Sequence, residues 1–163
     1  MTPDVQTIAK DRMRYTKDKF SSMLAILAIV FDCLYFVSIY QSDVGTFYYN
    51  WLIGVSIVYN LIFLLAAFLA SESVKNRRTG YSGILIVLGV VQIARIFILP
   101  AQAHAATVLV NGVETVVMGD KQYLYCVACL VISAICCIVA AVVSAKNNKT
   151  LADYMKTLEN KAA

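Results

Sequence analysis

The chain has 163 residues, of which 60% are apolar and 15% are charged, whereas an ordinary soluble domain has about 25% charged residues. This composition predicts a membrane protein and argues against a soluble enzyme or binding module. The net charge of +4 does not indicate a nucleic-acid partner, because basic residues that flank apolar segments set membrane topology and contact anionic lipid headgroups.

Four apolar segments each approach the length of about 20 residues with which a helix crosses a bilayer. They are residues 20–40, 48–70, 81–99 and 123–144. We therefore expect an all-α membrane protein with a single domain, residues 1–163, folded as a four-transmembrane-helix bundle. Such a chain contacts the lipid bilayer as a multi-pass protein, and we expect it in the plasma membrane.

The residues before the first span begin with Thr2-Pro3-Asp4, an order that is typical of a helix N-terminus. We expect a short helix that begins there and can run directly into the first span. Its apolar residues include Val5, Ile8 and Met13. Two placements stay open for this helix: its apolar face lies on the membrane surface, or it extends into solvent.

Positive charges are distributed unevenly between the two ends of the predicted spans. Of the 14 Lys and Arg residues, 12 lie before the first span, between the second and third spans, or after the fourth. The other two are Lys121, in the last loop, and Arg95, inside the third span. Because loops rich in Lys and Arg remain in the cytoplasm, the N- and C-termini are both predicted to be cytoplasmic.

The long exterior loop, Pro100 to Gln122, contains a β-hairpin signal. Residues 107–118 read TVLVNGVETVVM, in which two runs of β-branched residues flank Asn111-Gly112, a strong turn sequence. We expect a short extracytoplasmic β-hairpin between the third and fourth spans. Its apolar face is expected to rest on the outer mouth of the bundle or on a partner subunit, as a structural cap or as a docking element.

The segment after the fourth span predicts a further short helix. Apolar residues recur at intervals of three and four residues between Leu151 and Leu158, as on an amphipathic helix. We therefore expect a cytoplasmic C-terminal helix over residues 150–160.

Several polar residues whose transfer into lipid is energetically unfavourable lie inside the predicted spans. Counted at 1.5 Å per residue, Asp32 and Gln92 lie about 12 Å and about 10 Å below the outer ends of their spans, so they share a depth. Arg95 is one turn above Gln92, whereas Tyr59 and Asn60 lie deeper, near the midplane. Because charged residues in membranes usually face a bundle interior or a wet cavity, these residues are candidates for a functional site.

Three interpretations of Asp32 and Arg95 stay open. They form a structural ion pair that fixes helix register, or Asp32 is an exchangeable carboxylate in a ligand or ion site that Arg95 tunes. Alternatively, Arg95 extends outward to the headgroups and leaves Asp32 in a water-filled crevice. Asn60 and Gln92 are expected to form hydrogen bonds between helices.

All five cysteines lie in predicted spans, four of them in the fourth. Cys126-Val127-Ala128-Cys129 forms a C-x-x-C pair at the outer start of this span. In a four-span protein, this pair resembles the quinone-linked disulfide-forming enzymes of the DsbB and vitamin K epoxide reductase type. The resemblance implies a membrane thiol oxidoreductase that uses Cys126 and Cys129. Those enzymes also carry a shuttle cysteine pair in an exterior loop, and the predicted exterior loops of this chain contain no cysteine.

A different pattern covers more of the fourth span. Small residues recur every four positions, a spacing that lets another helix approach closely. We expect this face to pack against other helices rather than to hold a metal, because no His, Asp or Glu lies near the thiols. The residues of this helix-packing face are Cys129, Ser133, Cys137, Ala141 and Ala145.

No phosphate-binding, dinucleotide-binding or hydrolase motif occurs in the sequence. We therefore expect a non-enzymatic accessory or assembly subunit that acts through helix packing, without a cofactor. Its expected partner is a second copy of the chain or another membrane protein. The alternative is a small oligomeric channel or transporter built around the polar layer of Asp32 and Arg95.

Overall fold

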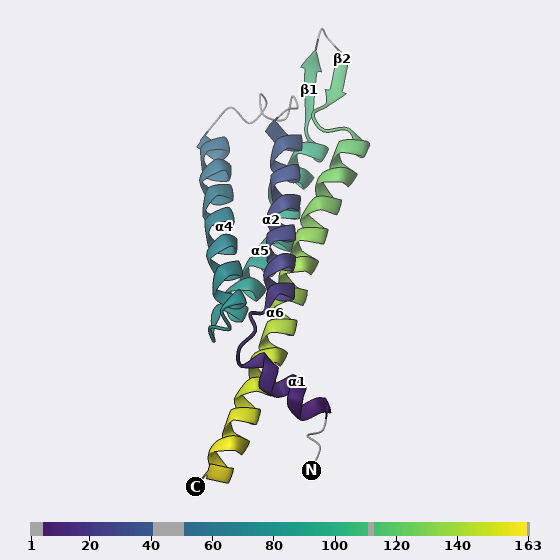
Figure 1. The fold of residues 1–163 in the computed structure, drawn as a ribbon. Coiled ribbons are helices and arrows are strands. Elements are labelled where there is room, and N and C mark those ends of the chain that lie inside the picture. Colours follow the sequence, from purple (N-terminus) through teal and green to yellow (C-terminus); the bar gives the residue numbers. More distant parts are fainter. Residues whose placement is uncertain (1–4, 41–50, 111–112, 163) are drawn as a thin grey trace.

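The computed structural model describes residues 5–40, 51–110 and 113–162. Four helices in this part of the chain are long and apolar enough to cross a membrane, as the sequence predicts for a multi-pass membrane protein. Figure 1 shows these helices side by side, with both chain ends at one end of the bundle. The four helices are α2 (Lys19–Tyr40), α4 (Trp51–Lys75), α5 (Tyr81–Ala105) and α6 (Asp120–Ala162).

The third span is longer than predicted. Helix α5 continues through Pro100 to Ala105, so the loop expected to begin at Pro100 begins after Ala105. A proline removes one backbone donor from a helix, but three alanines among residues 101–105 favour continuation of this one. The extra turn brings His104 Nε2 to 3.0 Å from Asp120 Oδ1, at the start of α6.

The segment 150–160 is helical, but it is not a separate helix. Helix α6 is unbroken from Asp120 to Ala162, and Figure 1 shows it extending beyond the other spans toward the C-terminus. No glycine or proline interrupts residues 145–150. The Thr150 hydroxyl donates to the Lys146 carbonyl at 2.9 Å, so it bonds within the helix instead of capping a new one.

The N-terminal helix does not run into the first span. Helix α1 (Val5–Met13) ends before a short irregular segment. Asp18 then caps α2, because its carboxylate accepts from Ser21 N at 3.2 Å and from the Ser21 hydroxyl at 3.0 Å. The expected start at residues 2–4 lies outside the described residues.

Between α5 and α6 the chain forms two antiparallel strands, β1 (Thr107–Val110) and β2 (Val113–Val116). Val110 pairs with Val113, the register expected for a two-residue loop, although Asn111-Gly112 itself lies outside the described residues. Figure 1 shows the strands projecting beyond the ends of the helices. The Val108, Val110 and Val113 side chains, on which the expected apolar face depends, also lie outside the described part.

Helix α5 packs tightly against α6 at Gly89. A Cβ atom at this position would lie 2.8 Å from Ile138 Cγ1 and 3.2 Å from the Ala134 carbonyl oxygen. The second contact is with backbone, which cannot rotate out of the way. Glycine therefore permits a spacing of these two helices that any larger residue would have to widen.

We expect Gly89→Leu to lower the free energy of unfolding by about 1–3 kcal/mol, because the larger side chain would force α5 and α6 apart. Gly83→Leu on the same helix is the matched control, since a Cβ at Gly83 meets nothing within 4 Å. It should leave stability unchanged or raise it, because leucine favours a helix more than glycine does. Unfolding in detergent provides the measurement, and equal stability of the two variants would contradict the close crossing.

Candidate functional site

Five polar residues from all four long helices meet in one buried layer. Asp32 lies on α2, Asn60 on α4, Gln92 and Arg95 on α5, and Ser133 on α6. Asp32 is 0% exposed and Arg95 is 6% exposed. We call these five residues the polar layer.

Arg95 and Asp32 form the centre of the polar layer. Arg95 Nη1 lies 2.5 Å from Asp32 Oδ1, and it also donates to Gln92 Oε1 at 2.7 Å. Arg95 Nη2 donates to Asn60 Oδ1. The guanidinium therefore binds α2 and α4 at the same time, and it points into the bundle rather than toward the headgroups.

The layer continues from α5 to α6 through Gln92. The Gln92 amide nitrogen donates to Asp32 Oδ1 at 2.9 Å and to the Ser133 hydroxyl at 3.2 Å. The Ser133 hydroxyl in turn donates to the Ala28 carbonyl on α2 at 2.9 Å. The sequence indicates Ser133 only as a small packing residue, because nothing local shows which polar group a serine will face.

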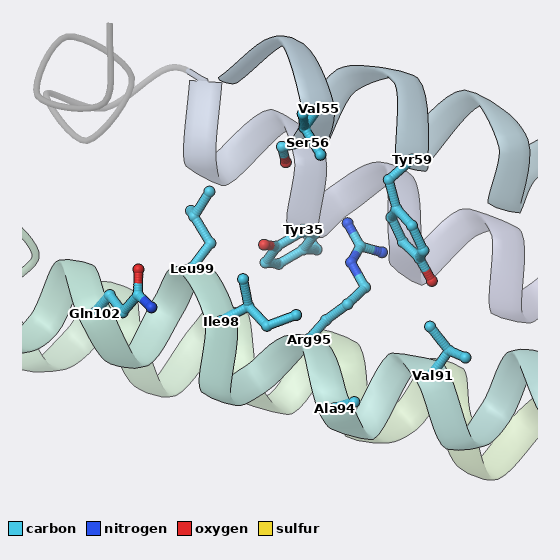
Figure 2. A pocket seen from close by; sticks show the side chains of 10 residues that line it. All are labelled: Tyr35, Val55, Ser56, Tyr59, Val91, Ala94, Arg95, Ile98, Leu99 and Gln102. Atoms are coloured by element: carbon cyan, nitrogen blue, oxygen red, sulfur yellow. The ribbon is translucent and has the colours of Figure 1, made fainter. Parts of the chain in front are cut away.

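Two tyrosines enclose the guanidinium. Arg95 Cζ lies 4.7 Å from the centre of the Tyr35 ring and 4.6 Å from that of Tyr59, and Figure 2 shows Arg95 between them. A desolvated cation over an aromatic face gains about 2 kcal/mol. The sequence does not predict Tyr35 as part of the site. Its position one helical turn from Asp32 indicates, however, that the two side chains share a face of the first span.

Some polar atoms of the site have no hydrogen-bond partner among the described residues. They are Asp32 Oδ2, Asn60 Nδ2 and the Tyr59 hydroxyl, all of them buried. A cavity of about 180 Å³ lies beside Arg95 between α4 and α5. Figure 2 shows its mostly apolar wall, with Ser56 and Gln102 nearer the outer end.

The packing face of α6 differs in part from the four-residue repeat. Cys129, Ser133, Cys137 and Ala141 are buried, but Ala145 is exposed. A step of four residues rotates around a helix by about 40° beyond a full turn, so the repeat leaves the buried face within a few steps. One line of fully buried positions alternates steps of four and three residues, as in a coiled coil; it consists of Cys126, Leu130, Ser133, Cys137, Ala140 and Ser144.

The C-x-x-C pair is enclosed by the bundle. Cys126 and Cys129 are both buried, and all five cysteines have free thiols. Cys126 Sγ lies 3.6 Å from the Ser38 hydroxyl of α2. Across the described ranges, no group of three potential metal ligands occurs. Cys126 therefore contacts α2, and both thiols lie in the buried core of the bundle rather than at an open surface.

Comparison of the chain with family models, with curated proteins and with solved structures gives no match. The function must therefore be inferred from the geometry of the polar layer and of the surfaces around it.

We expect Asp32→Asn and Arg95→Gln each to lower the free energy of unfolding by about 3–5 kcal/mol, because each leaves one buried charge without its partner. The double variant should recover much of the loss, since both charges are then absent. Thermal unfolding of the three variants in detergent measures this coupling. Additive losses in the double variant would contradict an ion pair between these side chains.

Proposed function

We propose that this chain is a non-enzymatic accessory or assembly subunit of a membrane complex, which acts through helix packing. The observation that supports this proposal is the use of the polar layer inside one bundle. Arg95 is shared among Asp32, Gln92 and Asn60, and each of these side chains is nearly or fully buried. Because these polar side chains bind one another across the helices, they fit a structural role better than the lining of a conducting path.

The apolar outer faces of the spans provide the surface for this role. On α4 the exposed side chains include Leu61, Ile62 and Leu65, each at least 60% exposed. Lipid covers such a face, and so does a helix of another chain. We infer that the partner is a second copy of the chain or another membrane protein, within the plasma membrane.

The distribution of charge supports an orientation with both termini in the cytoplasm. The N- and C-termini lie at the same end of the bundle, opposite the strands β1 and β2 (Figure 1). Twelve of the 14 Lys and Arg residues belong to segments at this end. The positive-inside rule then assigns the two strands to the exterior.

One observation favours the alternative, a small oligomeric channel or transporter. Asp32 Oδ2 and Asn60 Nδ2 have no partner in the described part of the chain, and the cavity between α4 and α5 is lined by Arg95, which binds both residues. An exchangeable carboxylate needs one oxygen free to bind a proton or a cation. The cavity would be the path by which such a ligand reaches the layer.

Purification from native membranes in a mild detergent, followed by mass measurement, tests the accessory role. We expect a particle several times heavier than the 18.0 kDa chain, and the Asp32→Asn/Arg95→Gln double variant should retain it because its fold is preserved. Ion flux through liposomes that contain the purified chain, abolished by Asp32→Asn in protein that remains folded, would contradict the accessory role and support the alternative.

The orientation has its own test. In a cysteine-free background, an impermeant thiol reagent added to intact cells should label Glu114→Cys on β2 but not Thr157→Cys on α6. Both positions are exposed, so access from solvent should depend on the side of the membrane. Permeabilised cells, in which both variants should react, provide the control. Labelling of Thr157→Cys in intact cells would reverse the assignment.

A further inference from the structure

A second hollow lies at the basic end of the bundle, away from the polar layer. It has a volume of about 620 Å³ and is lined by residues 15–20 and by Arg77. These residues belong to the segment that enters α2 and to the turn between α4 and α5. The hollow therefore lies where two spans leave the membrane.

Three cationic side chains line this hollow: Lys17, Lys19 and Arg77. Asp18 is the one acid in the lining, and its side chain is directed into the protein. Its carboxylate accepts bonds from Ser21 and, at 3.1 Å, from the Asn147 amide of α6. Because Asp18 is only 4% exposed, the accessible surface of the hollow is cationic.

Arg77 occupies a backbone position that usually belongs to glycine. Its φ angle is 55°, and it follows the end of α4, where Arg77 N donates to the Val74 carbonyl and Arg78 N donates to the Ser73 carbonyl. In this helix-ending motif glycine is the usual residue, since a side chain is strained there. Strain that persists at one residue points to a role for its side chain.

The Arg77 side chain is held in place by one hydrogen bond, and one of its other donors has no partner among the described residues. Its Nε donates to the Thr16 carbonyl at 3.0 Å, which holds the guanidinium against the segment that enters α2. Its Nη1 is buried and makes no hydrogen bond with the described residues, whereas the residue as a whole is partly exposed. The guanidinium is thus held at the wall of the hollow, and one of its donors is unsatisfied within the described part of the chain.

The hollow lies at the depth of lipid headgroups. Lys19 is the first residue of a span, and two aromatic residues beside it, Tyr15 and Phe20, are 80% and 61% exposed. Exposed aromatic side chains at the end of a span are typical of the membrane interface. A ligand in this hollow would therefore be in contact with the bilayer.

We propose that this hollow binds the phosphate headgroup of an anionic phospholipid. Arg77, Lys17 and Lys19 provide the donors and positive charges that a phosphate requires. Tyr15 and Phe20 flank the part of the lipid that joins the headgroup to its acyl chains. This binding is independent of the accessory role and of the polar layer, because it uses a different end of the bundle.

Lipid titration of the full chain in neutral detergent micelles tests the proposal. Phosphatidylglycerol should raise the midpoint of thermal unfolding in a saturable way, whereas phosphatidylcholine and inorganic phosphate at the same concentrations should not. Arg77→Gln should raise the half-saturating phosphatidylglycerol concentration about fivefold, the effect of one interfacial cation. Arg78→Gln is the matched control: it removes the same charge from the next residue, which does not line the hollow.

A Lys17→Gln/Lys19→Gln variant keeps the test valid if Arg77→Gln fails to fold. Neither lysine side chain has an ion pair with the described residues. Without lipid, this variant should therefore unfold like the parent, but it should bind phosphatidylglycerol much more weakly.

Equal stabilisation by phosphatidylglycerol and phosphatidylcholine would overturn the proposal. Equal losses for Arg77→Gln and Arg78→Gln would also overturn it, since they would indicate general attraction to the basic end. A shift with inorganic phosphate equal to that with the lipid would overturn the lipid assignment.

Discussion

Hydrocarbon contains no water to solvate a charge, so a guanidinium inside the bundle must find its partners on neighbouring helices. The partners of Arg95 are Asp32 on α2 and Asn60 on α4. The distances allowed by these bonds fix how far each helix can slide or rotate. Gln92 extends the same constraint to Ser133 on α6. The relative placement of all four spans therefore depends on the Asp32–Arg95 ion pair and on its hydrogen bonds.

A second polar contact region holds the basic end of the bundle together. The Ser22 and Ser71 hydroxyl oxygens lie 2.9 Å apart and join α2 to α4, and Asp18 joins the start of α2 to Asn147 on α6. Between these two regions the packing is apolar, and Gly89 lets α5 and α6 pack tightly. Polar contacts thus select the partners and register of the helices, while apolar contacts fill the space between them.

The different roles of polar and apolar contacts bear on what the chain can do. The chemically active groups in the membrane interior are largely committed to one another, which favours an accessory subunit over a catalyst. The groups that remain available lie at the ends and on the outer faces of the bundle. At the basic end, the side chains of Arg77, Lys17 and Lys19 line one hollow. This arrangement is the basis for our proposal that the chain interacts through its surfaces, with lipids and with other helices.

The sequence by itself determined the four spans, because hydropathy and length are local properties that a bilayer selects directly. It also indicated the polar layer, since Asp32, Gln92 and Arg95 are costly in lipid wherever their helices lie. Only the tertiary structure decided that Ser133 completes this layer and that Tyr35 packs against the Arg95 guanidinium. It also decided that α5 passes through Pro100 and that α6 continues without a break to Ala162. These features depend on which helices face each other. The sequence around a hydroxyl, an aromatic ring or a helix end does not indicate which residue of another helix will contact it.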